Sequence, residues 1–126
     1  MLDVYLRKAE ERDVDLLFRW ANDESVRKNY FHTEPIPYED HKKWYAEKLK
    51  SNNSIIYIYY SGGESVGQVR VDVEGNIGTI NYSIDGAYRS QGHGKKMLSL
   101  VEATAKEIAY NNKFDYLCCA CYSSKQ

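Results

Sequence analysis

Three short strands in immediate succession constrain this chain more than any other feature of its sequence. Residues 54–60 are β-branched and aromatic, and residues 66–73 and 77–84 follow with alternating apolar and polar side chains. Gly62-Gly63 separates the first two segments and Glu74-Gly75-Asn76 the second two, and glycine and asparagine are residues that tight turns require. The segment therefore predicts an antiparallel meander of three strands.

The segments on either side of the meander predict the rest of the fold. Alternation at residues 2–8 predicts a strand, the apolar spacing of 12–21 predicts an amphipathic helix, and Pro37 marks the start of a second helix. After the meander come a glycine-bearing loop, a long helix and an almost wholly apolar strand at 116–122. The order β-α-α-β-β-β-α-β predicts a single mixed α/β domain over residues 1–126.

Composition excludes several classes of protein. The 17 basic and 18 acidic side chains give a formal net charge of -1, which argues against a general nucleic-acid binder. No apolar run approaches the roughly 18 residues of a membrane span and the N-terminus lacks a signal-peptide segment, so we expect a cytoplasmic protein without a membrane partner. The three cysteines cluster as C-C-x-C without the second ligand pair of a zinc site, so we expect no metal.

The segment with the clearest chemistry is the loop from Arg89 to Gly94, which joins the meander to the long helix. A helix N-terminus presents unpaired N–H groups and a partial positive charge, and Gly92 lets an anion approach without a Cβ in the way. Lys95 and Lys96 lie in the first helical turn, where cations oppose the helix dipole at a cost of roughly 0.3–1 kcal/mol each. A polyanion bound there would explain these cations, and the alternative interpretation is a glycine turn whose lysines reach into water.

The loop and its surroundings resemble a known family. Arg89, Gly92 and Gly94 form an R-x-x-G-x-G pattern that follows a strand ending in Tyr82-Ser83-Ile84, and this pattern resembles the coenzyme A pyrophosphate loop of the GNAT acetyltransferase superfamily. The resemblance implies a GNAT-like mixed, mainly antiparallel sheet flanked by helices. It also implies an acetyl-CoA-dependent N-acetyltransferase, an acyltransferase whose co-substrate is acetyl-CoA.

The resemblance also assigns residues to the co-substrate. The residues expected to hold the pyrophosphate, through backbone N–H groups or charge, are Arg89, Gln91, Gly92, His93, Gly94, Lys95 and Lys96. Pantetheine would lie where the strand at 77–84 separates from the strand at 116–122, against the backbone of Tyr82, Ser83 and Ile84. A backbone N–H of that strand would stabilise the negative charge on the thioester oxygen while an amine attacks directly. From the residues alone, the His93 side chain is interpreted as a variable position between two glycines.

The acceptor side is expected at residues 22–45. This region and residues 66–72 look similar to acetyltransferases that act on amino-sugar nucleotides in pseudaminic-acid and spore-coat polysaccharide pathways. The attacking amine must lose a proton, for which Glu34, His32 and Asp72 are candidates. We expect Glu34 to be the catalytic base because its carboxylate could also hold the ammonium; a solvated loop carboxylate is the alternative.

The chain departs from the family at its C-terminal end. A complete GNAT domain continues with a helix and two further strands, so we expect either a C-terminally short form or a homodimer in which a second subunit covers the open sheet edge. The partner that the resemblance implies is a small-molecule amine. A protein or peptide N-acetyltransferase, a catalytically inactive acyl-CoA-binding module and an unrelated α/β domain remain as alternatives.

Overall fold

The computed structural model describes residues 3–23, 34–74, 77–112 and 116–121, with the side chains of these residues up to residue 104 except that of residue 77. In this part of the chain the strands are β1 (Val4–Lys8), β2 (Ser54–Ser61), β3 (Glu64–Glu74), β4 (Ile77–Ile84) and β5 (Tyr116–Cys121). The helical segments are the 3-10 turn η1 (Glu11–Asp13), α1 (Val14–Ala21), α3 (Tyr38–Lys50), the 3-10 turn η2 (Gly86–Tyr88) and α4 (His93–Asn112).

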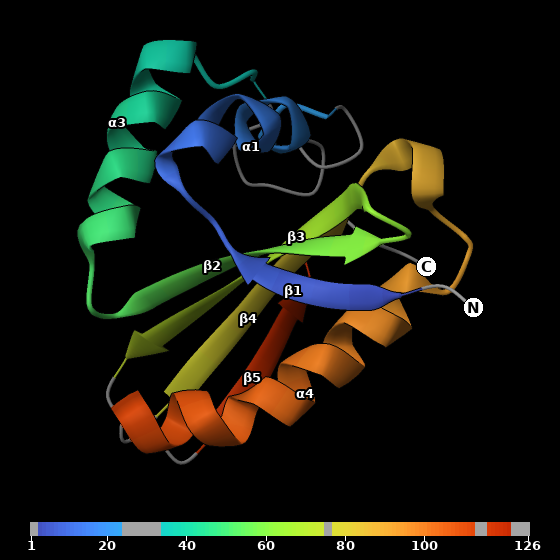
Figure 1. Ribbon diagram of the computed structural model, residues 1–126. Helices are drawn as coiled ribbons and strands as arrows, with labels where there is room; N and C mark the ends of the chain where they lie inside the picture. Colours follow the sequence, from blue (N-terminus) through green and yellow to red (C-terminus); the bar gives the residue numbers. More distant parts are fainter. Residues whose placement is uncertain (1–2, 24–33, 75–76, 113–115, 122–126) are drawn as a thin grey trace.

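The strands form one sheet in the order β1-β2-β3-β4-β5. β1 to β4 are antiparallel neighbours, and β5 pairs parallel with β4. Figure 1 shows α1 and α3 over one face of the sheet and α4 over the other, so α4 is the crossover that a parallel strand pair requires. The predicted mixed fold, its element order and its antiparallel meander are confirmed.

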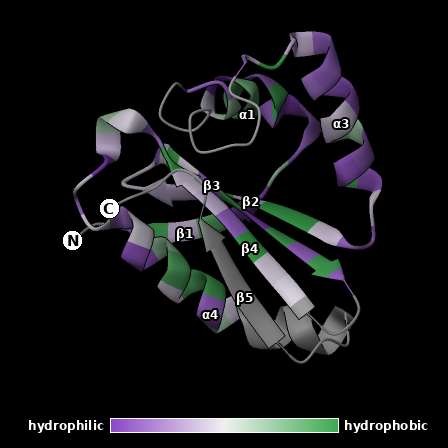
Figure 2. Ribbon diagram, turned by 180° about the vertical axis from the view of Figure 1, so that it is seen from behind, coloured by the Kyte–Doolittle hydropathy of each residue, from purple (hydrophilic) through white to green (hydrophobic). Residues whose placement is uncertain are grey.

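Two apolar layers hold the helices to the sheet. Under α4, Met97 and Val101 are buried against a set of strand side chains that are also buried: Tyr59, Val66, Val69, Val71, Ile80, Tyr82 and Ile84. On the opposite face a second cluster joins α1 and α3 to β2 through Leu17, Trp20, Tyr45, Ile56 and Ile58. Figure 2 shows this distribution, with hydrophobic residues on the strands and mostly hydrophilic residues along α3. At about 1.5–3 kcal/mol for each fully buried large apolar side chain, these two layers dominate the stability of the fold.

A hydrogen-bonded ion pair connects β1 to the first helix. The guanidinium of Arg7 donates two bonds to the buried Asp13 carboxylate, at 3.0 and 2.9 Å, and a third to the hydroxyl of Tyr60, at 2.8 Å. The Tyr45 hydroxyl of α3 donates to the carbonyl of Glu10 at 2.5 Å in the same region. Burial alone would raise the pKa of Asp13, but the bonds from Arg7 and from the Glu10 N–H lower it below its usual value.

No helix among the described residues is both long enough and apolar enough to cross a membrane.

Candidate active site

The N-terminal end of α4 leaves backbone N–H groups without a partner inside the helix. Ser90 and Gly92 both adopt left-handed backbone conformations, with φ of 65° and 81°. A Cβ added at Gly92 would meet no heavy atom within 4 Å, so the space beside this residue is open. The first N–H that bonds back along the helix is that of Lys96, which donates to the Gly92 carbonyl at 3.2 Å. The N–H groups of the four residues before Lys96 therefore have no partner within α4, as at any helix start.

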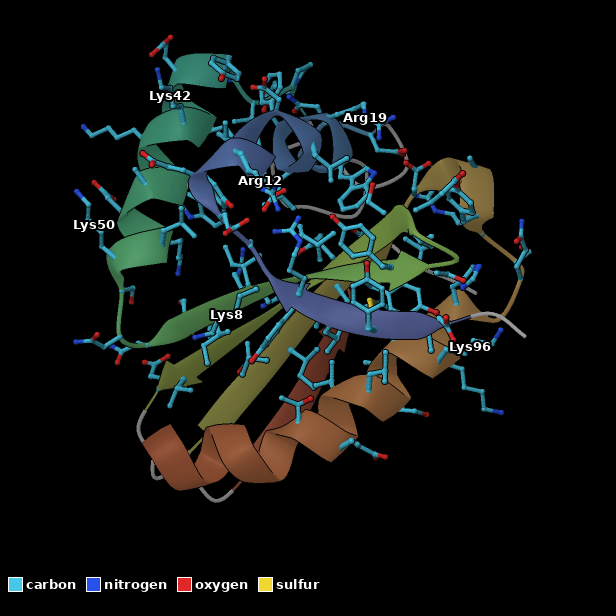
Figure 3. All side chains as sticks on the ribbon, in the orientation of Figure 1. Lys8, Arg12, Arg19, Lys42, Lys50 and Lys96 are labelled. Carbon is cyan, nitrogen blue, oxygen red and sulfur yellow. The ribbon has the colours of Figure 1, made fainter. Side chains whose placement is uncertain are left out.

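The three cationic side chains near this helix end point in different directions. Lys95 and Lys96 are exposed, and Figure 3 shows Lys96 projecting from the start of α4. Arg89 instead turns back toward the sheet: its Nε donates to the Ile84 carbonyl at 2.9 Å, and its Nη2 lies 3.7 Å from the Asp23 carboxylate. Arg89 thus fastens the loop to the end of β4, and the two lysines supply the outward positive charge.

Asp85 ties the same loop to α1. One carboxylate oxygen accepts a bond from the indole N–H of Trp20 at 2.8 Å and a longer one from Arg19 at 3.3 Å. The other oxygen accepts from the backbone N–H of Ala87 at 2.9 Å and so caps the 3-10 turn η2. The side chain that follows β4 therefore fixes both the direction of the loop and its distance from α1.

His93, at the first position of α4, points inward. Its side chain is 4% exposed, and Nδ1 lies 3.1 Å from the hydroxyl of the fully buried Tyr59 on β2. Burial lowers the pKa of His93, and the charge of Lys96 lowers it further, so the imidazole is neutral at pH 7. The interpretation of His93 as a variable position missed this contact. The available signal was the spacing of His93, Met97 and Val101, which places all three on one helix face.

The end of β4 leads directly into the loop. Tyr82 is in register with Cys121, the last residue of β5 that the structure describes, and on the other side of β4 Ser83 and Ile84 are in register with Gln68 and Gly67 of β3. The N–H of Asp85 donates to β3 at 2.7 Å. Because hydrogen-bonding groups alternate along a strand, the backbone N–H and C=O of Ile84 point to the opposite edge, toward the β5 side.

A glycine on β3 permits this arrangement. Gly67 is in register with Ile84, and a Cβ there would lie 2.6 Å from the Ser83 carbonyl oxygen and 2.9 Å from the Ile84 side chain. Real Cβ atoms do not approach a backbone oxygen so closely. Any larger residue at position 67 would push the end of β4 out of place.

On the face that carries α1 and α3, the sheet changes from apolar to polar between β2 and β3. The residues in register with Ser54, Ile56 and Ile58 of β2 carry polar side chains, and these make up what we call the polar strip: Gln68, Arg70 and Asp72 on β3, and Thr79, Asn81 and Ser83 on β4. Gln68 donates to the Ser83 hydroxyl at 3.1 Å. The strip can form hydrogen bonds, which distinguishes it from the helix-covered half of the same face.

Asp72 is the best-bonded member of the polar strip. It accepts from the Ser54 hydroxyl at 2.5 Å, from Arg70 Nε at 2.8 Å and from Asn81 Nδ2 at 3.3 Å, and Lys48 lies 3.5 Å away. Burial would raise the pKa of Asp72, but the Ser54 bond and the charges of Arg70 and Lys48 outweigh it and lower the pKa. A carboxylate stabilised in this way is a poor proton acceptor, which disfavours Asp72 as the catalytic base.

In the sequence, the other candidate bases fall between the residues of α1 and those of α3. Glu34 is exposed and is held near the end of α1, because the Asn22 side chain bonds to both the N–H and the carbonyl of Ile36, at 2.7 and 3.0 Å. His32 lies outside the described residues, as do all of residues 24–33 of the expected acceptor side. Among the described side chains, no three His, Cys, Asp or Glu residues gather as metal ligands would.

Comparison with known proteins identifies the class. The chain matches the acetyltransferase (GNAT) domain family over residues 3–124. No curated protein matches it by sequence. A domain from Methanocaldococcus jannaschii DSM 2661 superposes with a TM-score of 0.75 at 23% identity, over 87% of this chain and 74% of the other.

Two solved acetyltransferases share the fold. The spermidine N-acetyltransferase of Vibrio cholerae, solved with CoA and spermine, gives a TM-score of 0.69 at 13% identity, over 80% of this chain and 62% of that one. An aminoglycoside acetyltransferase solved with coenzyme A gives 0.69 at 19% identity, over 88% of this chain and 69% of that one.

The fold and the family match define an acetyl-CoA-dependent N-acetyltransferase. The chain belongs to the GNAT acetyltransferase family.

Proposed function

We propose that this chain acetylates the primary amine of an amino-sugar nucleotide and binds the pyrophosphate of acetyl-CoA on the N–H groups of residues 91–95. The observation that carries this proposal is the start of α4, where an open left-handed glycine and unpaired N–H groups lie beside two exposed lysines. The residues fit a diphosphate because each N–H donated to an anion is a charge-assisted hydrogen bond.

The charge distribution supports the same site. Lys95 and Lys96 are unfavourable beside a positive helix end, by roughly 0.3–1 kcal/mol each, when no anion is present. A bound diphosphate reverses the sign of this interaction. Arg89 contributes indirectly, because its bond to Ile84 and its ion pair with Asp23 hold the loop from behind.

The pantetheine arm is proposed to lie along the end of β4, against Tyr82, Ser83 and Ile84. The backbone of Ile84 points to the β5 side, and the end of β4 leads into the loop at Asp85. A backbone N–H of this strand end would donate to the thioester oxygen as negative charge builds there. A donor fixed by the sheet needs no reorganisation during the reaction.

For the acceptor, we propose that a hydroxyl-rich amine lies against the polar strip. Asn81 and Ser83 of the strip are buried, and the four partly exposed side chains, Gln68, Arg70, Asp72 and Thr79, can form hydrogen bonds, which suits a sugar better than an apolar side chain. Trp44 is 38% exposed at the edge of the strip, with the Arg70 guanidinium 5.2 Å from its ring centroid. Arg70 keeps its bond to Asp72, so the Trp44 ring and the Arg70 fork are preorganised.

Glu34 remains the proposed base. Its carboxylate is exposed and stands two residues before the Asn22–Ile36 contact that fixes this segment to α1. The carboxylate would hold the acceptor ammonium and then take its proton, directly or through water.

The test is turnover with a panel of amines. We expect calorimetry to show coenzyme A binding, and thiol release from acetyl-CoA to be fastest with an amino-sugar nucleotide. The panel also contains spermidine, an aminoglycoside and a peptide amine, and preferred turnover of any of these would contradict the proposed acceptor. Binding of coenzyme A without thiol release for any amine would contradict the proposed catalysis.

A further inference from the structure

The contact between His93 and Tyr59 joins the start of α4 to an interior strand of the sheet. Tyr59 lies on β2, which is paired with β1 on one side and β3 on the other. His93 lies between Gly92, which has a left-handed conformation, and Gly94. Glycines lower the conformational restraint on both sides of the histidine, so the direction of the first turn of α4 depends on what holds His93.

We propose that His93 and Tyr59 form a clamp that positions the first turn of α4 for the coenzyme A pyrophosphate. Both are positioning residues, because their side chains lie behind the backbone that would meet the anion. The inference rests on the proposed function of the loop and adds to it two side chains that the R-x-x-G-x-G pattern does not specify.

The geometry of the pair supports a specific bond as well as apolar packing. The Nδ1 to hydroxyl distance is 3.1 Å, and the two rings meet edge to face with centroids 5.7 Å apart. Tyr88 contributes a second edge contact to the imidazole, at 6.2 Å. A buried imidazole and a buried phenol hydroxyl are each costly without a hydrogen-bond partner, and here each supplies the partner of the other.

A row of residues across three strands connects the clamp to the proposed pantetheine site. Tyr59 is in register with Gly67 on β3, and Gly67 is in register with Ile84 on β4. The same sheet level therefore carries the anchor of the helix turn and the strand end expected to bind pantetheine. A displaced Tyr59–His93 pair would shift the N–H groups of α4 relative to Ile84.

The clamp raises the fraction of molecules in which the first turn of α4 already has the conformation that binds coenzyme A. Apparent affinity for a ligand falls in proportion to the population of the competent conformation. Removing one buried hydrogen bond from a turn flanked by glycines is expected to weaken coenzyme A binding about five- to tenfold. The acceptor site and the reacting groups keep their arrangement, so the effect falls on the KM for acetyl-CoA, with kcat and the acceptor KM unchanged.

The experiment compares four variants of the whole chain by calorimetry with coenzyme A and by steady-state kinetics. Tyr59→Phe removes only the hydroxyl, and His93→Leu removes both ring nitrogens. His93→Asn keeps a polar atom near the position of Nδ1 and is expected to stay within about twofold of the unchanged protein. Tyr60→Phe is the matched control, because the adjacent tyrosine hydroxyl bonds to Arg7 in another part of the fold, at 2.8 Å.

The expected pattern is weaker coenzyme A binding in Tyr59→Phe and His93→Leu, rescue in His93→Asn and no change in Tyr60→Phe. The double variant Tyr59→Phe/His93→Leu should bind no more weakly than His93→Leu, because both changes break one bond. If the unchanged protein binds coenzyme A and Tyr59→Phe binds it equally well, the clamp is wrong while the proposed function stands. If the unchanged protein does not bind coenzyme A, the proposed function itself fails. Should His93→Leu not fold, Tyr59→Phe alone decides.

Discussion

Substituting Gly92 by alanine tests the proposed anion site most directly. Gly92 has a φ of 81°, and the Cβ of an alanine there would project into space with no heavy atom within 4 Å. The substitution creates no clash within the protein. It has two separable consequences: backbone strain, and a methyl group in the space through which a phosphate must approach the N–H groups.

The strain has a built-in control. Gly63, in the turn between β2 and β3, has a φ of 82° and also has no heavy atom within 4 Å of an added Cβ. A left-handed conformation costs a non-glycine residue about 1–2 kcal/mol. Gly92→Ala and Gly63→Ala should therefore lose similar stability, with Tm lower by roughly 3–12 °C in thermal melts of both variants.

Coenzyme A affinity should separate the two variants. Loss of one charge-assisted bond to the pyrophosphate costs about 1.5–3 kcal/mol, which corresponds to a roughly 10- to 150-fold rise in the Kd measured by calorimetry. Gly63→Ala should bind as the unchanged protein does. Equal affinity in Gly92→Ala and Gly63→Ala would refute the assignment of the pyrophosphate to the start of α4.

Three further substitutions test other parts of the molecule. Gly67→Ala places a Cβ 2.6 Å from the Ser83 carbonyl oxygen, so overpacking should cost about 1–3 kcal/mol in chemical denaturation and raise the KM for acetyl-CoA; an unchanged KM would show that the end of β4 does not position the co-substrate. Asp13→Asn breaks the pair with Arg7 and should lower the free energy of unfolding at pH 7 by about 3 kcal/mol. Because folding lowers the pKa of Asp13, its stabilisation is present above the ordinary pKa of 3.8 and is lost as the pH falls through the folded-state pKa. The variant should therefore lose less stability in acid than the unchanged protein does, and parallel acid profiles would contradict this account. Glu34→Gln should lower kcat by roughly 10²- to 10⁴-fold with unchanged coenzyme A affinity, and an unchanged kcat would exclude it as the base.

The fold could be predicted because its signals are local. Each turn of the meander is marked by glycine within a few residues of the strands it joins, and Pro37 stands immediately before the helix that begins at Tyr38. Strand alternation predicts which residues share a face, but it does not say which faces meet. The polar strip depends on the register that aligns Arg70 with Asn81, and register is a property of the assembled sheet.

The site was predicted less completely than the fold, because several of its contacts join residues that are far apart in the sequence. The loop follows from its glycines and lysines, which are adjacent in sequence. The contacts that hold it are distant: Tyr59 lies 34 positions before His93, and Trp20 lies 65 before Asp85. The prediction that Arg89 contributes positive charge did not include the bond from its Nε to the carbonyl of Ile84.

These contacts share one physical logic. Backbone N–H groups bind an anion well only if their direction is fixed before the anion arrives, because an unfixed loop loses conformational freedom on binding. Three side chains fix this loop from behind, each on a different element: Arg89 on the end of β4, Asp85 on Trp20 of α1, and His93 on Tyr59 of β2. Each of these side chains makes its hydrogen bond within the protein. The outward face of the loop therefore carries main-chain N–H groups and the side chains of Lys95 and Lys96. The side chains of such a loop therefore determine the position of the backbone more than they determine contact with the ligand. Substitutions at Arg89, Asp85 and His93 should alter coenzyme A affinity although these side chains do not contact coenzyme A.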